Sequence, residues 1–110
     1  MAGPESSASA LFQPIKIGRS YLTHRIAMAP LTRYKADDQH VHSDIAVEYY
    51  EQRASTPGTL LIAEATFISP EAGGFTNVPG IYNSDQIAAW TRVRPFLFHC
   101  NLSLLTLACY

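Results

Sequence analysis

The feature that most constrains the fold of this chain is T-L-L-I-A-E-A-T-F-I, residues 59–68, an apolar run in which Glu64 is the one charged residue. Turn residues precede the run, and a long loop rich in glycine, proline and asparagine follows it. A short apolar run bounded in this way is typical of a strand covered on both faces, as in parallel sheets. Parallel strands need crossover connections, which are usually helices. The run therefore predicts an α/β fold.

Two further segments are expected to form strands before this one. Residues 15–23 alternate apolar and polar side chains around a Gly-Arg-Ser turn, which predicts a short hairpin. R-I-A-M-A-P, residues 25–30, predicts a buried strand that stops near Pro30, because proline has no amide hydrogen to donate to a ladder. The hairpin thus stands before the main sheet, and residues 25–30 open that sheet.

Two helices are expected between and after these strands. Ser43 or Asp44 is suited to cap the first helix, and its apolar face is formed by Ala46, Tyr49, Tyr50 and Ala54. The second helix should begin near Asn83 or Ser84, where N-S-D-Q offers a cap and an acidic side chain at the positive end of the helix dipole. Strand, helix, strand, loop and helix in this order predict the start of a βα repeat.

The strand at 25–30 ends in a row of different side chains, Leu31, Thr32, Arg33 and Tyr34. In α/β folds, ligands bind at the carboxyl ends of parallel strands. We therefore expect a ligand site here, completed by the end of the strand at 59–68.

Composition excludes several classes of function. The chain of 110 residues has 47% hydrophobic residues and a formal net charge of -1, and its basic residues do not cluster, so it does not resemble a nucleic-acid-binding protein. Residues 1–10 are small and polar, without the pattern of a secretory signal, and we interpret them as a loose leader. A cytoplasmic, reducing location follows as an expectation, with Cys100 and Cys109 as free thiols.

The character of the sequence changes from about Arg94, because residues 94–110 form an apolar tail with one charged residue. This run is shorter than the ~20 apolar residues that a membrane span needs, so no membrane association is expected. A buried third strand and a tail unrelated to the fold remain as alternatives.

Several stretches of the chain resemble one family in order and spacing. They are L-F-Q-P-I-K-I-G, H-R-I-A-M-A-P-L-T-R-Y, E-Y-Y-E-Q-R-A, P-G-T-L-L-I-A-E-A-T-F-I-S-P-E-A-G-G-F and N-V-P-G-I-Y-N-S-D-Q-I-A-A-W. Together they resemble the amino-terminal quarter of the old yellow enzyme family, the FMN-dependent NADPH dehydrogenases and ene-reductases, in forms closest to fungal members. The resemblance covers residues 11–93. It implies the opening of a (β/α)8 TIM barrel with a capping hairpin, two strands and two helices.

The resemblance also implies site residues, which it places at the ends of the two barrel strands. Pro30, Leu31, Thr32 and Ala65 match positions that contact FMN, the Thr32 hydroxyl near the O4/N5 edge of the ring and Ala65 where the backbone approaches it. Tyr34 and Phe75 match the mouth of the substrate pocket. The implied chemistry is hydride transfer from NADPH to FMN and then to an activated alkene, an enone or enal, in some fungal relatives within secondary metabolism.

Other polar residues have simpler interpretations. Glu64 is expected to be a buried acid paired with donors from strands beyond this chain rather than a catalytic carboxylate. His40 and His42, with Asp37, Asp38 and Asp44 nearby, lack the compact ligand set of a metal site. Gly73-Gly74 fits no phosphate-binding motif.

The family's later motifs have no counterpart in the sequence. Missing are the pair that polarises the substrate carbonyl, the proton-donating tyrosine and the residues that hold the FMN phosphate, so no catalytic residue is assigned. A barrel needs about 250 residues. We therefore expect a truncated, inactive member. The alternatives are an active FMN oxidoreductase with an incomplete gene model, and a small interaction module that associates through its open sheet edge.

Overall fold

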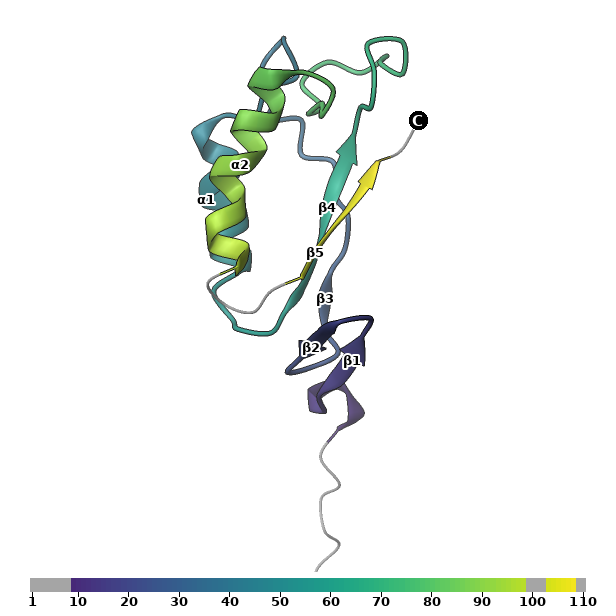
Figure 1. The fold of residues 1–110 in the computed structure, drawn as a ribbon, viewed down its shortest axis with the longest axis vertical. Coiled ribbons are helices and arrows are strands. Elements are labelled where there is room, and N and C mark those ends of the chain that lie inside the picture. The colour runs from purple at the N-terminus through teal and green to yellow at the C-terminus, as the bar shows by residue number, and fades with distance from the viewer. Residues whose placement is uncertain (1–8, 99–102, 109–110) are drawn as a thin grey trace, which may run out of the picture.

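The computed structural model describes residues 9–98 and 103–108, with the side chains from 94 onward left out of the description (Figure 1). In chain order, the elements are η1 Ala10–Phe12, β1 Ile15–Ile17, β2 Ser20–Leu22, β3 Ala27–Met28, α1 Asp44–Arg53, β4 Leu60–Thr66, α2 Ser84–Phe98 and β5 Ser103–Ala108. Cys100 and Cys109 lie outside the described residues, as do most of residues 1–10.

The predicted hairpin is confirmed as β1 and β2, which pair antiparallel. Ile17 pairs with Ser20, so a two-residue loop joins the strands, and Gly18 adopts the positive φ of 57° that such loops require. Thr23 then ties the hairpin to the turn before β4, because its amide donates to the carbonyl of Gly58 and its hydroxyl to the carbonyl of Pro57. The hairpin therefore lies below the amino ends of the parallel strands (Figure 1).

The main sheet has the order β3-β4-β5, and all its strands are parallel. Helix α1 connects β3 to β4, and α2 connects β4 to β5, so the chain forms two successive βαβ units. The two helices lie side by side on the same face of the sheet (Figure 1). This confirms the βα repeat and adds one strand, β5, which was an alternative for the tail. The separation of residues 94–110 as a divergent tail stays a prediction.

The core lies between β4 and the two helices. Tyr50 and Ala54 of α1, Leu61 and Ala63 of β4, and Trp90 and Val93 of α2 form one buried cluster. The predicted face of α1 is confirmed, since Ala46, Tyr50 and Ala54 are buried and Tyr49 packs against the cluster. Burial of these side chains, rather than helix propensity, holds short helices in place.

The helix starts were predicted correctly to within a residue, and one cap differs. Asn83 caps α2, since its Oδ1 accepts from the Gln86 amide at 2.9 Å. Ser43 occupies the cap position of α1 but makes no capping bond, because its hydroxyl donates to the carbonyl of Lys35. Within the described residues, none of the helices has the length and apolar character needed to cross a membrane.

Candidate functional site

The carboxyl ends of β3 and β4 lie next to each other. Met28 pairs with Leu61 in the parallel ladder, and the Arg33 amide donates to Glu64 Oε2 at 3.2 Å, so the segment after β3 continues along β4. This brings the predicted flavin residues at the end of β3 close to Ala65. Pro30 and Leu31 are exposed, and Thr32 is half-buried.

A bulge in β4 sets the direction of its last side chains. On β5 two positions separate the partners of Ala63 and Thr66, whereas on β4 three do, so β4 holds one extra residue. Ala63 belongs to the helix-side core, and Glu64 bonds to Tyr50 of α1, so two successive side chains lie on the helix side. Because side chains otherwise alternate along a strand, we expect Ala65 on the opposite face.

The side chain of Arg33 also lies on the helix side. Its guanidinium carbon is 5.5 Å from the centre of the Tyr49 ring of α1. We expect Thr32, directly before Arg33, to lie on the face away from the helices, as we expect for Ala65. A small side chain and a hydroxyl on one face would fit the plane and the polar edge of a flavin ring. Their contact with FMN stays a prediction.

The two predicted substrate-pocket residues, Tyr34 and Phe75, follow the ends of β3 and β4 in the chain. Phe75 lines an open hollow of about 310 Å³ together with Asp38, His40, Gly74 and Thr76. Tyr34 does not line it, is 54% exposed, and has a positive φ of 54° that is uncommon for a bulky residue. Both lie beyond the carboxyl ends of the strands, and their role at the pocket mouth stays a prediction.

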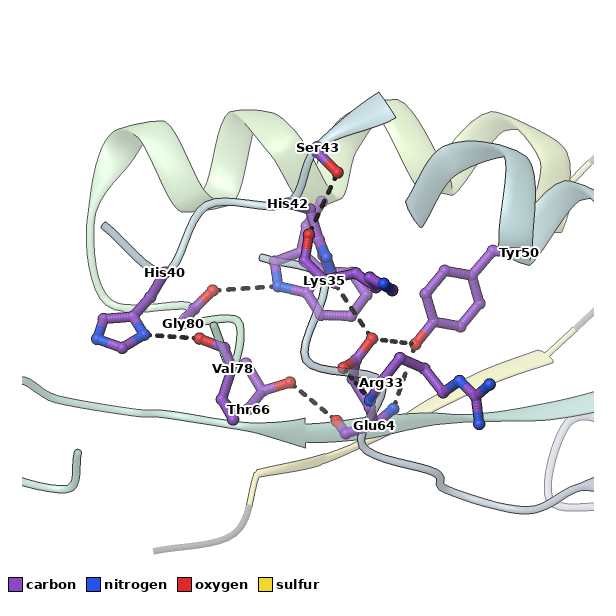
Figure 2. A network of polar contacts seen from close by, with 11 residues as sticks. Arg33, Lys35, His40, His42, Ser43, Tyr50, Glu64, Thr66, Val78 and Gly80 are labelled. Atoms are coloured by element: carbon purple, nitrogen blue, oxygen red, sulfur yellow. Dashed lines mark hydrogen bonds and ion pairs between the residues drawn. The ribbon is translucent and has the colours of Figure 1, made fainter. Parts of the chain in front are cut away.

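Glu64 is the centre of a buried polar network (Figure 2). Its Oε2 accepts from the Arg33 amide, and its Oε1 accepts from the Tyr50 hydroxyl at 3.3 Å. The same hydroxyl accepts from the Glu64 amide at 3.2 Å. The expectation of a paired buried acid is confirmed, but its predicted source of donors is wrong, because they come from α1 and from the segment after β3. The sequence could not show that this segment continues along β4 and reaches Glu64.

The network changes the pKa of two of its members. Burial raises the pKa of Glu64, against the lowering effect of the Arg33 amide and the Tyr50 hydroxyl. Burial also raises the pKa of Tyr50, and the nearby carboxylate of Glu64 adds to this. Tyr50 therefore stays a neutral donor at any physiological pH.

His42 lies beside this network without a hydrogen bond of its own. Its side chain is 1% exposed, its Nε2 is 3.8 Å from Glu64 Oε1, and within the described residues neither ring nitrogen has a hydrogen-bond partner. The ring packs edge-on against Trp90 with the centroids 4.4 Å apart. Burial, and then the charge of Arg92, lowers the pKa of His42 to about 4. The imidazole is thus a neutral core residue, and no metal-ligand cluster occurs in the described part of the chain.

The lowered pKa of His42 predicts a loss of stability in acid. Between pH 6.5 and 4 the unfolded chain binds a proton at His42 that the folded chain does not bind. The free energy of unfolding therefore decreases as the pH is lowered through this range. From pH 7 to 5 the loss should be about 2 kcal/mol at about 1.4 kcal/mol per pH unit. Glu64, with its raised pKa, takes up a proton on folding and offsets part of this loss in the wild type and the variant alike.

Urea unfolding of the wild type and of His42→Phe at several pH values measures this effect. Phenylalanine keeps a ring against Trp90 and cannot titrate, so the variant should lose about 2 kcal/mol less between pH 7 and 5. Parallel pH profiles for the two proteins would contradict a neutral, buried His42.

A second buried polar residue, Gln86, was not identified from the sequence. Its side chain accepts from the Tyr82 amide and donates to the carbonyl of Gln39, joining α2 to the loop before α1. Gly80 lies so close that an added Cβ would be 2.6 Å from Gln86 Oε1. A glutamine in the first turn of an amphipathic helix reads as a surface residue, and only the tertiary fold reveals its burial.

Solved structures that match this arrangement include old yellow enzymes, which are TIM barrels. The chain superposes on the old yellow enzyme from Pichia sp. AKU4542 with a TM-score of 0.85 and 35% identity, over 90% of this chain and 26% of that one. The fold is therefore the N-terminal portion of a TIM barrel. This confirms the predicted fold class.

The sequence places the chain within that class. The profile of the NADH:flavin oxidoreductase / NADH oxidase family matches residues 10–95, and the chain belongs to this family. It is 52% identical over 101 residues to the aldehyde reductase FrzD of Cladobotryum sp, covering 92% of this chain and 27% of the relative. It is 63% identical over 83 residues to the chanoclavine-I aldehyde reductase fgaOx3 of Penicillium roqueforti, covering 76% and 22%. The chain thus spans about a quarter of the length of these relatives.

Proposed function

We propose that this chain contacts one face and one edge of the flavin ring in an FMN-dependent oxidoreductase. We call the contacting residues, Pro30, Leu31, Thr32 and Ala65, the flavin floor. The observation that carries the proposal is the bond from the Arg33 amide to Glu64, which joins the segment that carries Thr32 to the end of β4 directly before Ala65. A hydroxyl and a methyl group on one face would fit a planar ring with a polar edge. Pro30 and Leu31, exposed just before Thr32, add main-chain contacts.

In this proposal FMN, when bound, would supply the chemistry of hydride transfer from NADPH to an activated alkene. The Thr32 hydroxyl donates to the O4/N5 edge of the ring, where a donor favours the added electron density of the reduced form. Tyr34 and Phe75 border the approach of the substrate. An enone or enal suits the two similar fungal proteins, which are named aldehyde reductases. We place the activity in the cytoplasm and, by analogy with these proteins, in secondary metabolism.

The 110 residues alone are proposed to be inactive. No residue in them matches the family's carbonyl-polarising pair, its proton-donating tyrosine or its phosphate-binding residues. Ring contacts without a phosphate anchor give weak binding, on the order of 0.1 mM or weaker. We therefore expect the isolated chain to bind FMN poorly and to leave NADPH unoxidised.

Two experiments test the proposal. The isolated chain, titrated with FMN and assayed with NADPH and cyclohexenone, should show weak binding and no turnover, and clear NADPH oxidation would contradict its inactivity. In a chimera, residues 10–95 replace the aligned segment of the Pichia enzyme, which supplies the rest of the barrel. A yellow chimera that oxidises NADPH would support the flavin floor, and a folded chimera without flavin would contradict it.

A further inference from the structure

Glu64 connects the two strand ends that carry the predicted ring contacts. One carboxyl oxygen accepts from the amide of Arg33, directly after Thr32, and the other accepts from Tyr50 of α1. Figure 2 shows these bonds converging on the carboxyl group of Glu64, one from Tyr50 of α1 and one from Arg33 in the segment after β3. Both strand ends are thereby fastened to the same helix.

The position of Glu64 in the bulge gives this connection a second effect. The bonds to Tyr50 hold the Glu64 side chain on the helix side, directly after Ala63, which already lies there. The side chain of the next residue, Ala65, is therefore expected on the opposite face. Without the bonds, regular alternation would place Glu64 on the ring side and Ala65 among the helices. Bulges beside functional sites commonly re-aim side chains in this way.

A carboxyl group is a costly choice for this place. Glu64 is 3% exposed, and a buried acid destabilises a fold unless its oxygens find donors. Its partners here are a main-chain amide and a neutral hydroxyl, while the cationic group of Arg33 lies over Tyr49 instead. An apolar residue would pack at lower cost but could not accept from the Arg33 amide. The need to accept hydrogen bonds from the Arg33 amide and the Tyr50 hydroxyl therefore explains why an acid occupies this position.

We propose that Glu64 is a positioning residue, which holds Thr32 and Ala65 on one face of the sheet through its bonds to the Arg33 amide and the Tyr50 hydroxyl. The inference rests on the proposed function, because it assigns the purpose of the arrangement to flavin binding. Glu64 itself does not touch the ring, since its side chain lies on the helix side of β4.

The first test is amide hydrogen exchange, followed by NMR, in the full chain and three variants. In Glu64→Ala the Arg33 amide loses its acceptor and should exchange at least about tenfold faster. Glu64→Gln keeps one carbonyl oxygen and should restore most of the protection. Glu48→Ala, which removes an exposed acid of α1, is the matched control and should leave the Arg33 amide unchanged. Unchanged exchange in a folded Glu64→Ala would overturn the proposal.

Tyr50→Phe keeps the ring in the core and removes only the hydroxyl, so it provides the test if Glu64→Ala does not fold. Without the bond from Tyr50, the Glu64 side chain is held less firmly, so the exchange rate of the Arg33 amide should rise several-fold. An unchanged exchange rate would overturn the proposal.

FMN titration of the same proteins tests the link to flavin. Affinity should fall by about tenfold in Glu64→Ala and recover in Glu64→Gln. Unchanged affinity in a variant with faster Arg33 exchange would overturn the positioning role. If the wild type binds no FMN, the flavin floor of the isolated chain fails, and the exchange rates still decide whether Glu64 holds the strand ends.

Discussion

Replacing Trp90 with alanine is expected to lower the free energy of unfolding by about 3–5 kcal/mol. The indole is 9% exposed and packs against His42 and Tyr50, with ring centroids 4.4 and 6.0 Å away. Its Nε1 also donates to the carbonyl of Gly80 at 3.1 Å, which fastens the loop before α2. Since small domains have only about 5–15 kcal/mol of stability, the variant should be largely unfolded.

Urea denaturation followed by far-ultraviolet circular dichroism measures this loss. Ile87→Ala is the matched control, because Ile87 lies one turn earlier on α2 and is 52% exposed, so its loss should stay below about 1 kcal/mol. Trp90→Phe separates the two contributions of the indole, since it keeps a ring and removes the bond to Gly80. It should cost about 1–3 kcal/mol. Equal losses for Trp90→Ala and Ile87→Ala would contradict the core described above.

The elements that were predicted correctly are those with a local cause. Residues 59–68 are apolar throughout, and this suffices to predict a buried strand, observed as Leu60–Thr66. Gly18 supplies the positive φ of the hairpin loop, and Asn83 supplies the cap of α2, both within a few residues of the element that they shape. Such signals depend on neighbours in sequence and can be read without the fold.

The features that the sequence did not reveal depend on contacts between distant residues. The Arg33 amide reaches Glu64 across 31 positions, and this bond replaces the outside partner that was expected for the acid. His42 resembles a loop histidine until α2 brings Trp90 against it. The extra residue in β4 becomes visible only in its pairing with β5, since its small side chains give no sign of a bulge.

The candidate site combines residues that the sequence predicted with a local geometry that it did not. The family resemblance named Thr32 and Ala65, but strict alternation along β4 would have placed Ala65 with Ala63 on the helix side. The bulge resolves this conflict and was not part of the prediction. Pattern rules fail at such places because functional sites tolerate local irregularity that the rest of the fold compensates.

Replacing Ala65 with leucine in the chimera with the Pichia enzyme is expected to weaken FMN binding by at least about a hundredfold. Ala65 lies at the end of β4, within the register shift between Ala63 and Thr66, and it is expected to face away from the helices and toward the ring plane. In the proposed arrangement only the Ala65 methyl group would separate the backbone from the ring. Leucine adds three carbons there, and packed sites do not accept such an increase without strain. The loss corresponds to about 2.8 kcal/mol, within the range of overpacking costs.

Flavin fluorescence and the visible absorbance of the purified chimera measure this loss, with the melting temperature as a check on folding. Ala88→Leu is the matched control, because it adds the same atoms at an exposed position of α2 and should retain flavin fully. Loss of flavin in Ala65→Leu but not in Ala88→Leu would mean that the close approach of the backbone to the ring limits binding, and that added side-chain volume elsewhere in the protein does not. Full flavin content in Ala65→Leu would mean that the ring does not lie against Ala65. The assignment of Thr32 to the polar edge of the ring would then fail as well, because both residues are expected on the same face of the sheet.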